Sequence, residues 1–365
     1  MKRLVAGLAA LSFSATYAAA GGIDRSGLPY AILFQDGKVS ELSFSNVTPN
    51  VSGTYPLALS GFGASTNNMT QSYTSLSFAF KGDISDKLAY AIIADQPYGA
   101  DARYTGGAYT GLEAHWSSTE LAALLRYRVT DRVSAYGGLR YVTSKANIAI
   151  PTALLGAAGA YSATAASDSK LGYVMGAAYE IPKIALRVGV TYQSAINHEF
   201  ATTEAFAGIG PGPTNTTKIT MPQSLAIDFQ SGIAKDTLLF GSVRWAEWSK
   251  WHVDPAFYHG VTGQEVTGFD HDVITYELGV GRKISAAVSV FASLGYEAPN
   301  HTVASRLSPT DGRKSIGLGA VWTRDTMKIT GGLQYVKLGN AVDGSGTVFK
   351  GNSAVGLGVK VDFSF

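Results

Sequence analysis

The sequence predicts an all-β protein, a transmembrane up-and-down antiparallel β-barrel of about fourteen strands with a short N-terminal plug in its lumen. The first observation is strict alternation, clearest in residues 355–365, where every odd-numbered residue is Val, Leu or Phe and every even-numbered one is small or polar. Successive side chains of a strand face opposite sides, so this segment has one apolar face and one polar face. A closed barrel in a bilayer gives such a strand a partner for its edge and an apolar medium for its face.

Alternating segments of this kind recur along the chain and are separated by turn residues, which is the pattern of a transmembrane barrel. After residue 20, no uninterrupted apolar stretch approaches the ~20 residues that a spanning helix needs. The predicted strands are approximately 38–52, 69–81, 86–97, 112–129, 132–146, 169–180, 184–197, 218–233, 237–252, 271–282, 286–298, 313–323, 326–338 and 349–365.

The connections between these segments alternate between tight polar turns and long loops. This asymmetry is required of an up-and-down barrel and places both termini on the short-turn, periplasmic side. The alternative, a soluble all-β sandwich, would not show it. The short turns fall at 82–83, 130–131, 181–183, 234–236, 282–284 and 324–325. The long loops fall at about 53–68, 98–111, 147–168, 198–217, 253–270, 299–312 and 339–348.

The first twenty residues read as a secretory signal. Lys2 and Arg3 precede an apolar run from Leu4 to Phe13, and Ala18 to Ala20 form a small-residue cleavage site. An exported barrel indicates the bacterial outer membrane. We therefore divide the chain into a signal peptide (1–20), an N-terminal plug (21–37) and a barrel (38–365).

Composition excludes several classes of function. The chain contains 42 Gly, 19 Tyr and 16 Phe with only 15% charged residues, which is unusual for a water-soluble enzyme. It has no Cys, so neither a disulfide framework nor a thiol nucleophile is available. A net charge of +2 argues against a nucleic-acid partner.

Three segments outside the predicted strands are unexpectedly apolar. Residues 28–34 (Leu-Pro-Tyr-Ala-Ile-Leu-Phe) are predicted to fold into the lumen as a plug, and the alternative is a disordered periplasmic tail. The loops 147–168 and 198–217 are also apolar, which indicates a landing groove for a hydrophobic solute. The alternative is that these loops only pack against each other or dip into lipopolysaccharide.

Six short segments of the chain can be compared, in order and spacing, with motifs of a known family. They lie at 26–28 (Ser-Gly-Leu), 51–54 (Val-Ser-Gly-Thr), 97–99 (Pro-Tyr-Gly), 221–223 (Met-Pro-Gln), 245–251 and 308–313. With the strand layout, the plug and the two apolar loops, they make the mature chain resemble the FadL/TodX family of outer-membrane transporters for long-chain fatty acids and other hydrophobic compounds. The chain departs from the family pattern in its plug, which is about half the usual length and lacks the Asn-Pro-Ala segment. This departure affects the details of gating.

The resemblance implies uptake of hydrophobic small molecules such as long-chain fatty acids along an ordered path. The solute docks between the apolar loops, enters a lumen pocket beside the plug, and leaves sideways at a kink in the third strand. That kink is expected at Gln96 and Pro97, since Pro cannot donate to a strand ladder; a simple strand end is the alternative. The candidates for the loop groove are Leu154, Leu155, Phe206 and Ile209, and those for the plug side of the pocket are Ile32, Leu33 and Phe34.

A fatty-acid carboxylate would need a basic partner in the lumen. The candidates are Arg140 and Arg244, which face inward by strand parity, and Lys145 near the end of the fifth strand. The alternative is that they form a structural network with Asp228 and Glu277. An uncharged hydrocarbon would need none of them.

Two other functions compete with this interpretation. A general diffusion porin would use more strands and a charged constriction loop, and an outer-membrane lipid hydrolase would need a Ser and a His on the outer wall. The His residues are scattered over loops and strand ends, so no catalytic residue and no enzyme activity is predicted. We expect no cofactor and no metal site, although several His and Asp residues fall within 252–272. The expected partners are a hydrophobic ligand and outer-membrane lipid and lipopolysaccharide, and the expected state is a monomer.

Overall fold

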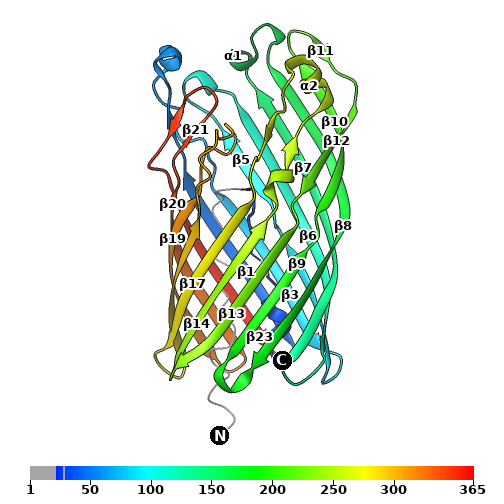
Figure 1. Cartoon of the computed structure of the whole chain (residues 1–365), viewed down its shortest axis with the longest axis vertical. Coiled ribbons are helices and arrows are strands. Elements are labelled where there is room, and N and C mark those ends of the chain that lie inside the picture. Colours follow the sequence, from blue (N-terminus) through cyan, green and yellow to red (C-terminus); the bar gives the residue numbers. More distant parts are fainter. Residues whose placement is uncertain (1–21, 28) are drawn as a thin grey trace.

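The computed structural model describes residues 22–27 and 29–365, so the predicted signal peptide lies outside the described residues. The chain forms a closed antiparallel barrel (Figure 1). Closure is made by β1 (Val39–Asn50) and β23 (Ser353–Ser364), which pair along their whole length. The predicted barrel of fourteen strands is confirmed.

Three of the fourteen barrel strands are interrupted. The third consists of β4 and β5, the seventh of β9 and β10, and the eighth of β12 and β13. The others are continuous, and neighbours along the chain pair with each other. Besides β1 and β23, the barrel strands are β3 (Tyr73–Asp83), β4 (Leu88–Asp95), β5 (Gly99–Arg103), β6 (Glu113–Arg128), β7 (Val133–Ile150), β8 (Tyr161–Ile181), β9 (Leu186–Gln193), β10 (Ile196–Phe206), β12 (Asn215–Met221), β13 (Ser224–Ala234), β14 (Thr237–Ala246), β17 (Val273–Lys283), β18 (Val288–Glu297), β19 (Arg313–Arg324) and β20 (Met327–Leu338).

The connections give the barrel two unlike ends, a short-turn end and a long-loop end, and the C-terminus lies at the short-turn end (Figure 1). In the described residues, no helix has the length and apolar character needed to cross a membrane. The helical segments are η1 (Pro29–Phe34), η2 (Leu57–Phe62), η3 (Gly107–Tyr109), α1 (Thr152–Leu155), η4 (Gly156–Ala158), η5 (Pro182–Ile184), η6 (Trp248–Lys250) and α2 (Ala256–Thr262). The short strands of the loops are β2 (Gly53–Thr54), β11 (Gly210–Pro211), β15 (His252–Val253), β16 (Thr267–Gly268), β21 (Ala341–Val342) and β22 (Val348–Phe349).

The outer wall carries the apolar residues that the alternation predicts. On β23, Leu357 is 55% exposed whereas Ala354, which faces inward on the same strand, is buried. Exposed aromatic rings form two girdles, as expected where a barrel meets the two membrane surfaces. The girdle at the short-turn end includes Tyr127, Tyr179 and Trp322, and the other includes Tyr141, Tyr173, Tyr276, Tyr296 and Tyr335.

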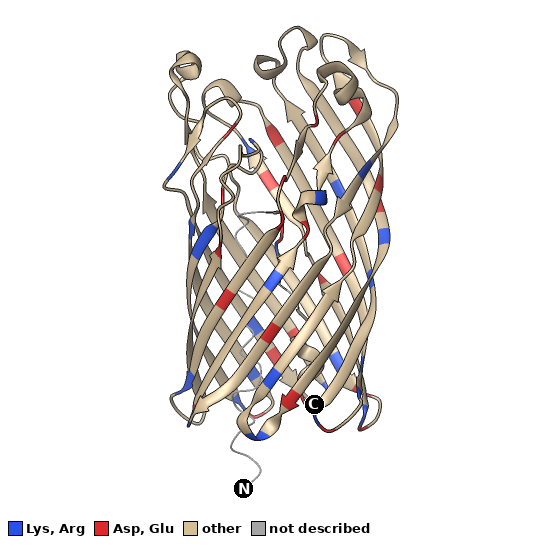
Figure 2. Ribbon diagram, in the orientation of Figure 1, with Lys and Arg blue, Asp and Glu red and all other residues tan. Residues whose placement is uncertain are grey.

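Charged residues lie along the barrel strands (Figure 2), and many of their side chains are buried inside the barrel. Arg140 and Arg126, for example, are each less than 10% exposed although both belong to membrane-level strands. Placing such groups on the lipid side would cost roughly 2–4 kcal/mol near the bilayer midplane. The alternation of side chains along each strand therefore directs apolar residues toward lipid and charged residues toward ion-pair partners inside the barrel.

The wall reverses its polarity beyond the outer girdle. On β10, Phe200 and Phe206 face inward and are buried, whereas Asn197 and Glu199 face outward and are exposed. This arrangement is expected where water rather than lipid bathes the outside. The predicted loops 147–168 and 198–217 are therefore too long, because their ends are strands. The connections themselves span only 151–160 and 207–214.

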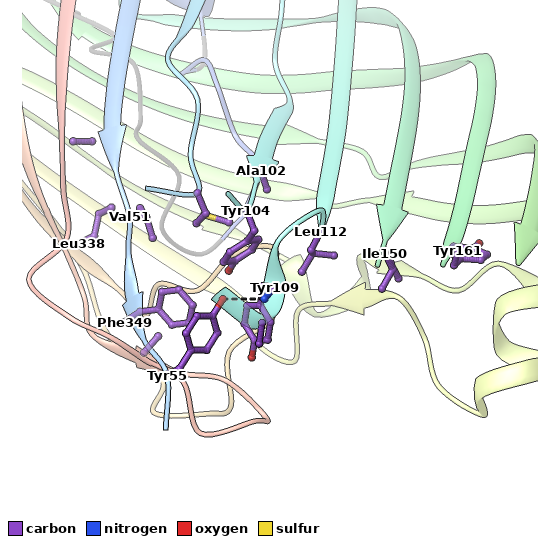
Figure 3. Close-up of a cluster of buried hydrophobic side chains, with 14 of the residues drawn as sticks. Val51, Tyr55, Ala102, Tyr104, Tyr109, Leu112, Ile150, Tyr161, Leu338 and Phe349 are labelled. Atoms are coloured by element: carbon purple, nitrogen blue, oxygen red, sulfur yellow. Dashed lines mark hydrogen bonds between the residues drawn. The ribbon is translucent and has the colours of Figure 1, made fainter. Parts of the chain in front are cut away.

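A hydrophobic cluster fills the long-loop end of the barrel (Figure 3). Tyr109 packs edge-on against Tyr55 and Tyr104, with ring centroids 5.0 and 5.2 Å apart. The Tyr109 backbone N–H donates to the Tyr55 hydroxyl at 3.0 Å. Burial raises the pKa of Tyr55 to about 12, so this hydroxyl stays protonated. The loops at this end consequently form a packed layer.

The N-terminal segment runs inside the barrel and ends where β1 begins. In η1, Ile32 and Leu33 are buried among inward-facing residues of β3, β4 and β6. The Arg126 guanidinium donates to the Leu33 carbonyl at 3.1 Å. Phe34 lies between the guanidinium groups of Arg126 and Arg187, 4.3 and 4.7 Å from its ring centroid. Apolar packing and cation–π contacts together fix this segment in the lumen.

Candidate functional site

A large apolar cavity, of about 750 Å³, lies inside the barrel beneath the loops. Its described lining contains no Lys, Arg, Asp or Glu, and most of it is aliphatic or aromatic. A predominantly apolar lining of this kind is typical of small-molecule sites. The wall is built mainly from Ile23 of the N-terminal segment, Trp116 of β6, Ala163 of β8, Ile219 of β12, and Trp251 and Phe269 of the loop 247–272.

Aromatic packing holds the 247–272 loop over this cavity. Trp251 contacts Trp116 edge-on at 6.0 Å and lies 5.0 Å from Phe269, measured between ring centroids. Trp248 in turn packs against Tyr98 at 6.1 Å, next to the interruption of the third strand. The loop therefore acts as a cover that connects the cavity to that interruption.

A buried carboxylate fastens the other side of the cover. Glu204 on β10 accepts the backbone N–H groups of Phe257 and Tyr258 at 3.2 and 2.8 Å, at the start of α2. It also accepts the Tyr161 hydroxyl at 2.9 Å. Burial and the neighbouring carboxylate raise the pKa of Tyr161, so its hydroxyl remains a donor.

The third strand is interrupted between Asp95 and Gly99, a stretch that contains Gln96 and Pro97. Pairing with β6 passes from Asp95↔Glu120 to Gly99↔Ser117, so one extra residue is accommodated here. Pro97 has no N–H to donate, and the Tyr98 N–H is satisfied by the Ser118 hydroxyl at 2.9 Å. The strand bends at this point.

The bend separates the third strand from the second. Pairing of β3 with β4 runs from Asp83↔Ala89 to Phe78↔Ala94, and the next contact beyond it is the bridge Thr70↔Ala102. The stretch of β3 between these pairs has no strand partner on this side among the described residues. A lateral gap in the strand ladder results, crossed by one hydrogen bond from the Leu76 N–H to the Gln96 side-chain oxygen at 3.3 Å.

The N-terminal segment covers this gap from inside. Asp24 forms an antiparallel bridge with Tyr98. The Arg25 N–H donates to the Pro97 carbonyl, and the Gly99 N–H donates to the Ile23 carbonyl, both at 2.8 Å. The segment therefore adds a short strand to the bent edge.

Two further cavities meet at this gap. The second cavity, of about 680 Å³, shares Ile23, Ala100 and Leu307 with the apolar cavity and reaches Arg25 and Tyr73. A third, of about 610 Å³, lies on the other side of Arg25. We call it the serine chamber, because its described lining includes Ser26, Ser43, Ser45, Ser75 and Ser77, together with Glu41, Asp95 and Lys360.

The basic residues that the sequence suggested are engaged or directed elsewhere. Arg140 is 1% exposed and donates twice to one oxygen of Glu120, at 3.0 and 2.6 Å. Arg244 donates to Asp24 at 2.6 Å. Lys145 is exposed at a bulge between β7 and β8.

The structure brings together three of the four residues predicted for the loop groove. Phe206 is buried in the outer hydrophobic cluster, and Leu154 and Leu155 pack against that cluster while half-buried. Ile209 is 55% exposed at the tip of its loop. These four residues remain predictions as ligand contacts.

The residues predicted for the plug side of the pocket lie apart from the apolar cavity. Ile32, Leu33 and Phe34 belong to a separate cluster against β3, β4 and β6. The described part of the N-terminal segment contributes Ile23 to the cavity instead. Neither Ile23 nor Phe269 could be predicted as a site residue, because both reach the site through contacts between distant parts of the chain.

The His and Asp residues of 252–272 form separate pairs. His252 contacts Glu265 at 2.8 Å and His259 contacts Asp254 at 2.9 Å. Within residues 22–27 and 29–365, no three His, Asp or Glu side chains are placed to hold a metal ion together.

Comparison with known proteins identifies the family. A family model described as outer membrane protein transport protein (OMPP1/FadL/TodX) matches residues 13–348, which is most of the chain. The chain belongs to this family. Membership places this FadL/TodX protein in the outer membrane, among transporters of hydrophobic compounds. The long-loop end is accordingly extracellular and the short-turn end periplasmic.

Solved structures of low sequence identity share the fold of this FadL/TodX protein. A Pseudomonas aeruginosa FadL homologue superposes with a TM-score of 0.73 at 13% identity, covering 92% of each chain. The toluene transporter TodX of Pseudomonas putida gives 0.66 at 13% identity, covering 96% of this chain and 98% of TodX. The toluene transporter TbuX of Ralstonia pickettii gives 0.64 at 14% identity, covering 99% of both. No curated protein sequence matches the chain.

Proposed function

We propose that this protein takes up hydrophobic small molecules by binding them in the apolar cavity and releasing them sideways through the gap between the second and third strands. The observation that carries the proposal is the cavity of about 750 Å³, whose described lining holds no Lys, Arg, Asp or Glu. An apolar solute gains free energy there in proportion to the area it removes from water, at roughly 25 cal/mol per Å².

The first step is docking at the extracellular loops. Connections 151–160 and 207–214 touch each other, since the Gly208 N–H donates to the Ala158 carbonyl at 3.0 Å. Leu154, Leu155 and Ile209 lie on or beside this contact and offer apolar surface, with Phe206 below them. We propose that a solute lands here and passes under the 247–272 loop into the cavity.

The last step is lateral release at Gln96–Pro97. The route straight through the lumen passes the polar serine chamber next to the gap and is then obstructed by η1. An oily solute is therefore favoured to leave into the bilayer. The N-terminal segment bonded to Pro97 and Gly99 has to yield for this exit to open.

Two of the solved structures with the same fold are described as toluene transporters, and a third is described as a FadL homologue. We extend to this protein only the shared class of hydrophobic solute. We also propose that it acts without a cofactor or catalytic step, as a monomer in contact with lipid and lipopolysaccharide.

A diffusion porin is the main alternative, and the lumen argues against it. The N-terminal segment, fixed by Arg126 and Arg187, obstructs the bore. Single-channel conductance in planar bilayers separates the two functions. We expect almost no ion current, and a large stable conductance would favour the porin.

Filling the cavity tests the proposal directly. Ala163→Trp places an indole on the cavity wall, whereas Ala201→Trp, on the outward face of β10, is the matched control. We expect the first variant to lower uptake of an apolar solute such as toluene by at least tenfold, with the control unchanged. Equal uptake by both variants would contradict the proposed site.

A further inference from the structure

We propose that Arg25 is a specificity-determining residue that binds the anionic head group of the solute, so that the route selects an apolar molecule bearing a carboxylate over an uncharged hydrocarbon. This inference rests on the proposed function and names its substrate class. Arg25 lies at the junction of the second cavity and the serine chamber, and no other described residue lines both.

The side chain of Arg25 differs from the other lumen arginines in its partners. Arg140, Arg126 and Arg313 each contact a carboxylate, namely Glu120, Glu180 and Glu297. Among the described residues, no carboxylate oxygen lies within 4.0 Å of the Arg25 guanidinium, whose Nε is buried without a hydrogen-bond partner. A half-buried cation without a carboxylate in contact leaves its buried donor unsatisfied.

The guanidinium lies over the ring of Tyr73, 4.2 Å from its centroid. This cation–π contact engages the face of the guanidinium and leaves donors in its plane for a carboxylate. Gly99 allows the close approach on the other side, since a Cβ there would overlap the Arg25 side chain. Arg25 thus spans the gap between β3 and β5.

The cavities provide space for both parts of an amphiphile. The apolar cavity and the second cavity share Ile23, Ala100 and Ala102, so an apolar body can lie in the first while its head group reaches the end of the second. In the described lining of these two cavities, Arg25 is the one Lys or Arg side chain. The head group therefore meets its cation at the lateral gap.

Acidic groups lie on both sides of Arg25, one in the second cavity and two in the serine chamber. Asp101 also lines the second cavity, and its carboxylate contacts His115 at 3.4 Å. Asp95 and Glu41 line the serine chamber beyond Arg25. Within that chamber Glu41 is already paired with Lys360 at 3.2 Å, so a carboxylate that comes from the second cavity meets Arg25 first, beside the lateral exit.

The test compares dodecanoate with 1-dodecanol, which differ in the head group and share the chain. Equilibrium binding of each is measured to the full-length protein in amphipol, for wild type, Arg25→Gln and Arg25→Lys. Arg103→Gln, on the neighbouring strand β5 with a side chain 67% exposed, is the matched control. Heat-modifiability on gels checks that each variant is folded.

We expect Arg25→Gln to weaken dodecanoate binding by at least about tenfold, as for loss of a charge-assisted hydrogen bond. Dodecanol binding should change less than about twofold, and Arg25→Lys should restore most of the dodecanoate affinity. Equal weakening of both ligands, or no weakening of either, would overturn the role of Arg25 while leaving the cavity intact as a binding site. Failure of wild type to bind either ligand would instead overturn the proposed function.

Discussion

The carboxylate of Glu204 accepts the backbone N–H of Tyr258 at 2.8 Å, and this bond fastens α2 to β10. The same side chain accepts the Tyr161 hydroxyl and the Phe257 N–H, so donors from two other elements converge on one residue that is 4% exposed. Because α2 belongs to the loop that covers the apolar cavity, Glu204 holds that cover closed.

Replacing Glu204 should loosen the cover without unfolding the barrel. Glu204→Ala leaves buried donors unsatisfied, which costs roughly 1–3 kcal/mol per group. We expect hydrogen exchange of the amides in 256–262 to accelerate in this variant. Glu199→Ala, on the outward face of the same strand, is the control and should leave those amides unchanged. Unaltered exchange in Glu204→Ala would show that other contacts hold α2.

A reversible cross-link should control release of the solute. Asp24 and Tyr98 are directly opposed in an antiparallel bridge, where Cα atoms lie close enough for a disulfide. The chain has no Cys, so an Asp24→Cys/Tyr98→Cys variant forms one defined pair. We expect the oxidised variant to bind an apolar solute but not to transport it, and reduction to restore transport in the same sample. Equal transport in both redox states would contradict release beside the N-terminal segment.

We expect the Arg140–Glu120 ion pair to stabilise the barrel and to play no part in binding the solute. Removing one member, as in Arg140→Met, leaves a buried carboxylate unpaired and should cost about 3–5 kcal/mol. Arg140→Met/Glu120→Leu removes both charges and should recover much of that stability, which thermal unfolding in detergent measures. Solute binding by the double variant should equal that of wild type. Loss of binding in the folded double variant would show that Arg140 contacts the solute.

Mild acid should destabilise the extracellular end of the wall. His198 is buried above the outer girdle, its Nδ1 lies 2.8 Å from Asp168, and burial lowers its pKa. The unfolded state therefore takes up a proton on this imidazole at a higher pH than the folded state does. The contribution of neutral His198 to the free energy of unfolding is fully present above the ordinary pKa of ~6.5 and is lost as the pH falls below it. We expect faster hydrogen exchange of β10 at pH 5 than at pH 7.5, after correction for intrinsic rates, and a smaller difference in His198→Phe. An equal pH response in both proteins would exclude His198 as the cause.

Strand parity predicted most of the barrel because lipid outside and ion pairs inside give the two faces opposite character. Leu357 and Arg140 were thus assigned correctly to the outside and inside. The same rule failed beyond the girdle, where water replaces lipid and Phe200 turns inward. For this reason the ends of the segments 147–168 and 198–217 were predicted as loops although they are strands.

An irregularity of the strand at Pro97 could be expected from the sequence, since an imino acid cannot donate to a strand ladder, but a bulge could not be told from a strand end. The neighbours of Pro97 were not predictable, because the positions of Arg25 and Phe269 follow from contacts between segments far apart in the chain. Pairing of Arg140 with Glu120 likewise depends on the register between β6 and β7, which alternation alone does not specify.

The most direct test of the account is to locate a bound solute by anomalous scattering from crystals of the protein grown with 1-bromododecane. We expect a bromine peak inside the cavity between Trp116 and Phe269, or continuous density there for the apolar chain that carries the bromine. Bromine found only on the outer wall, with the cavity free of ligand at saturating solute, would contradict the account.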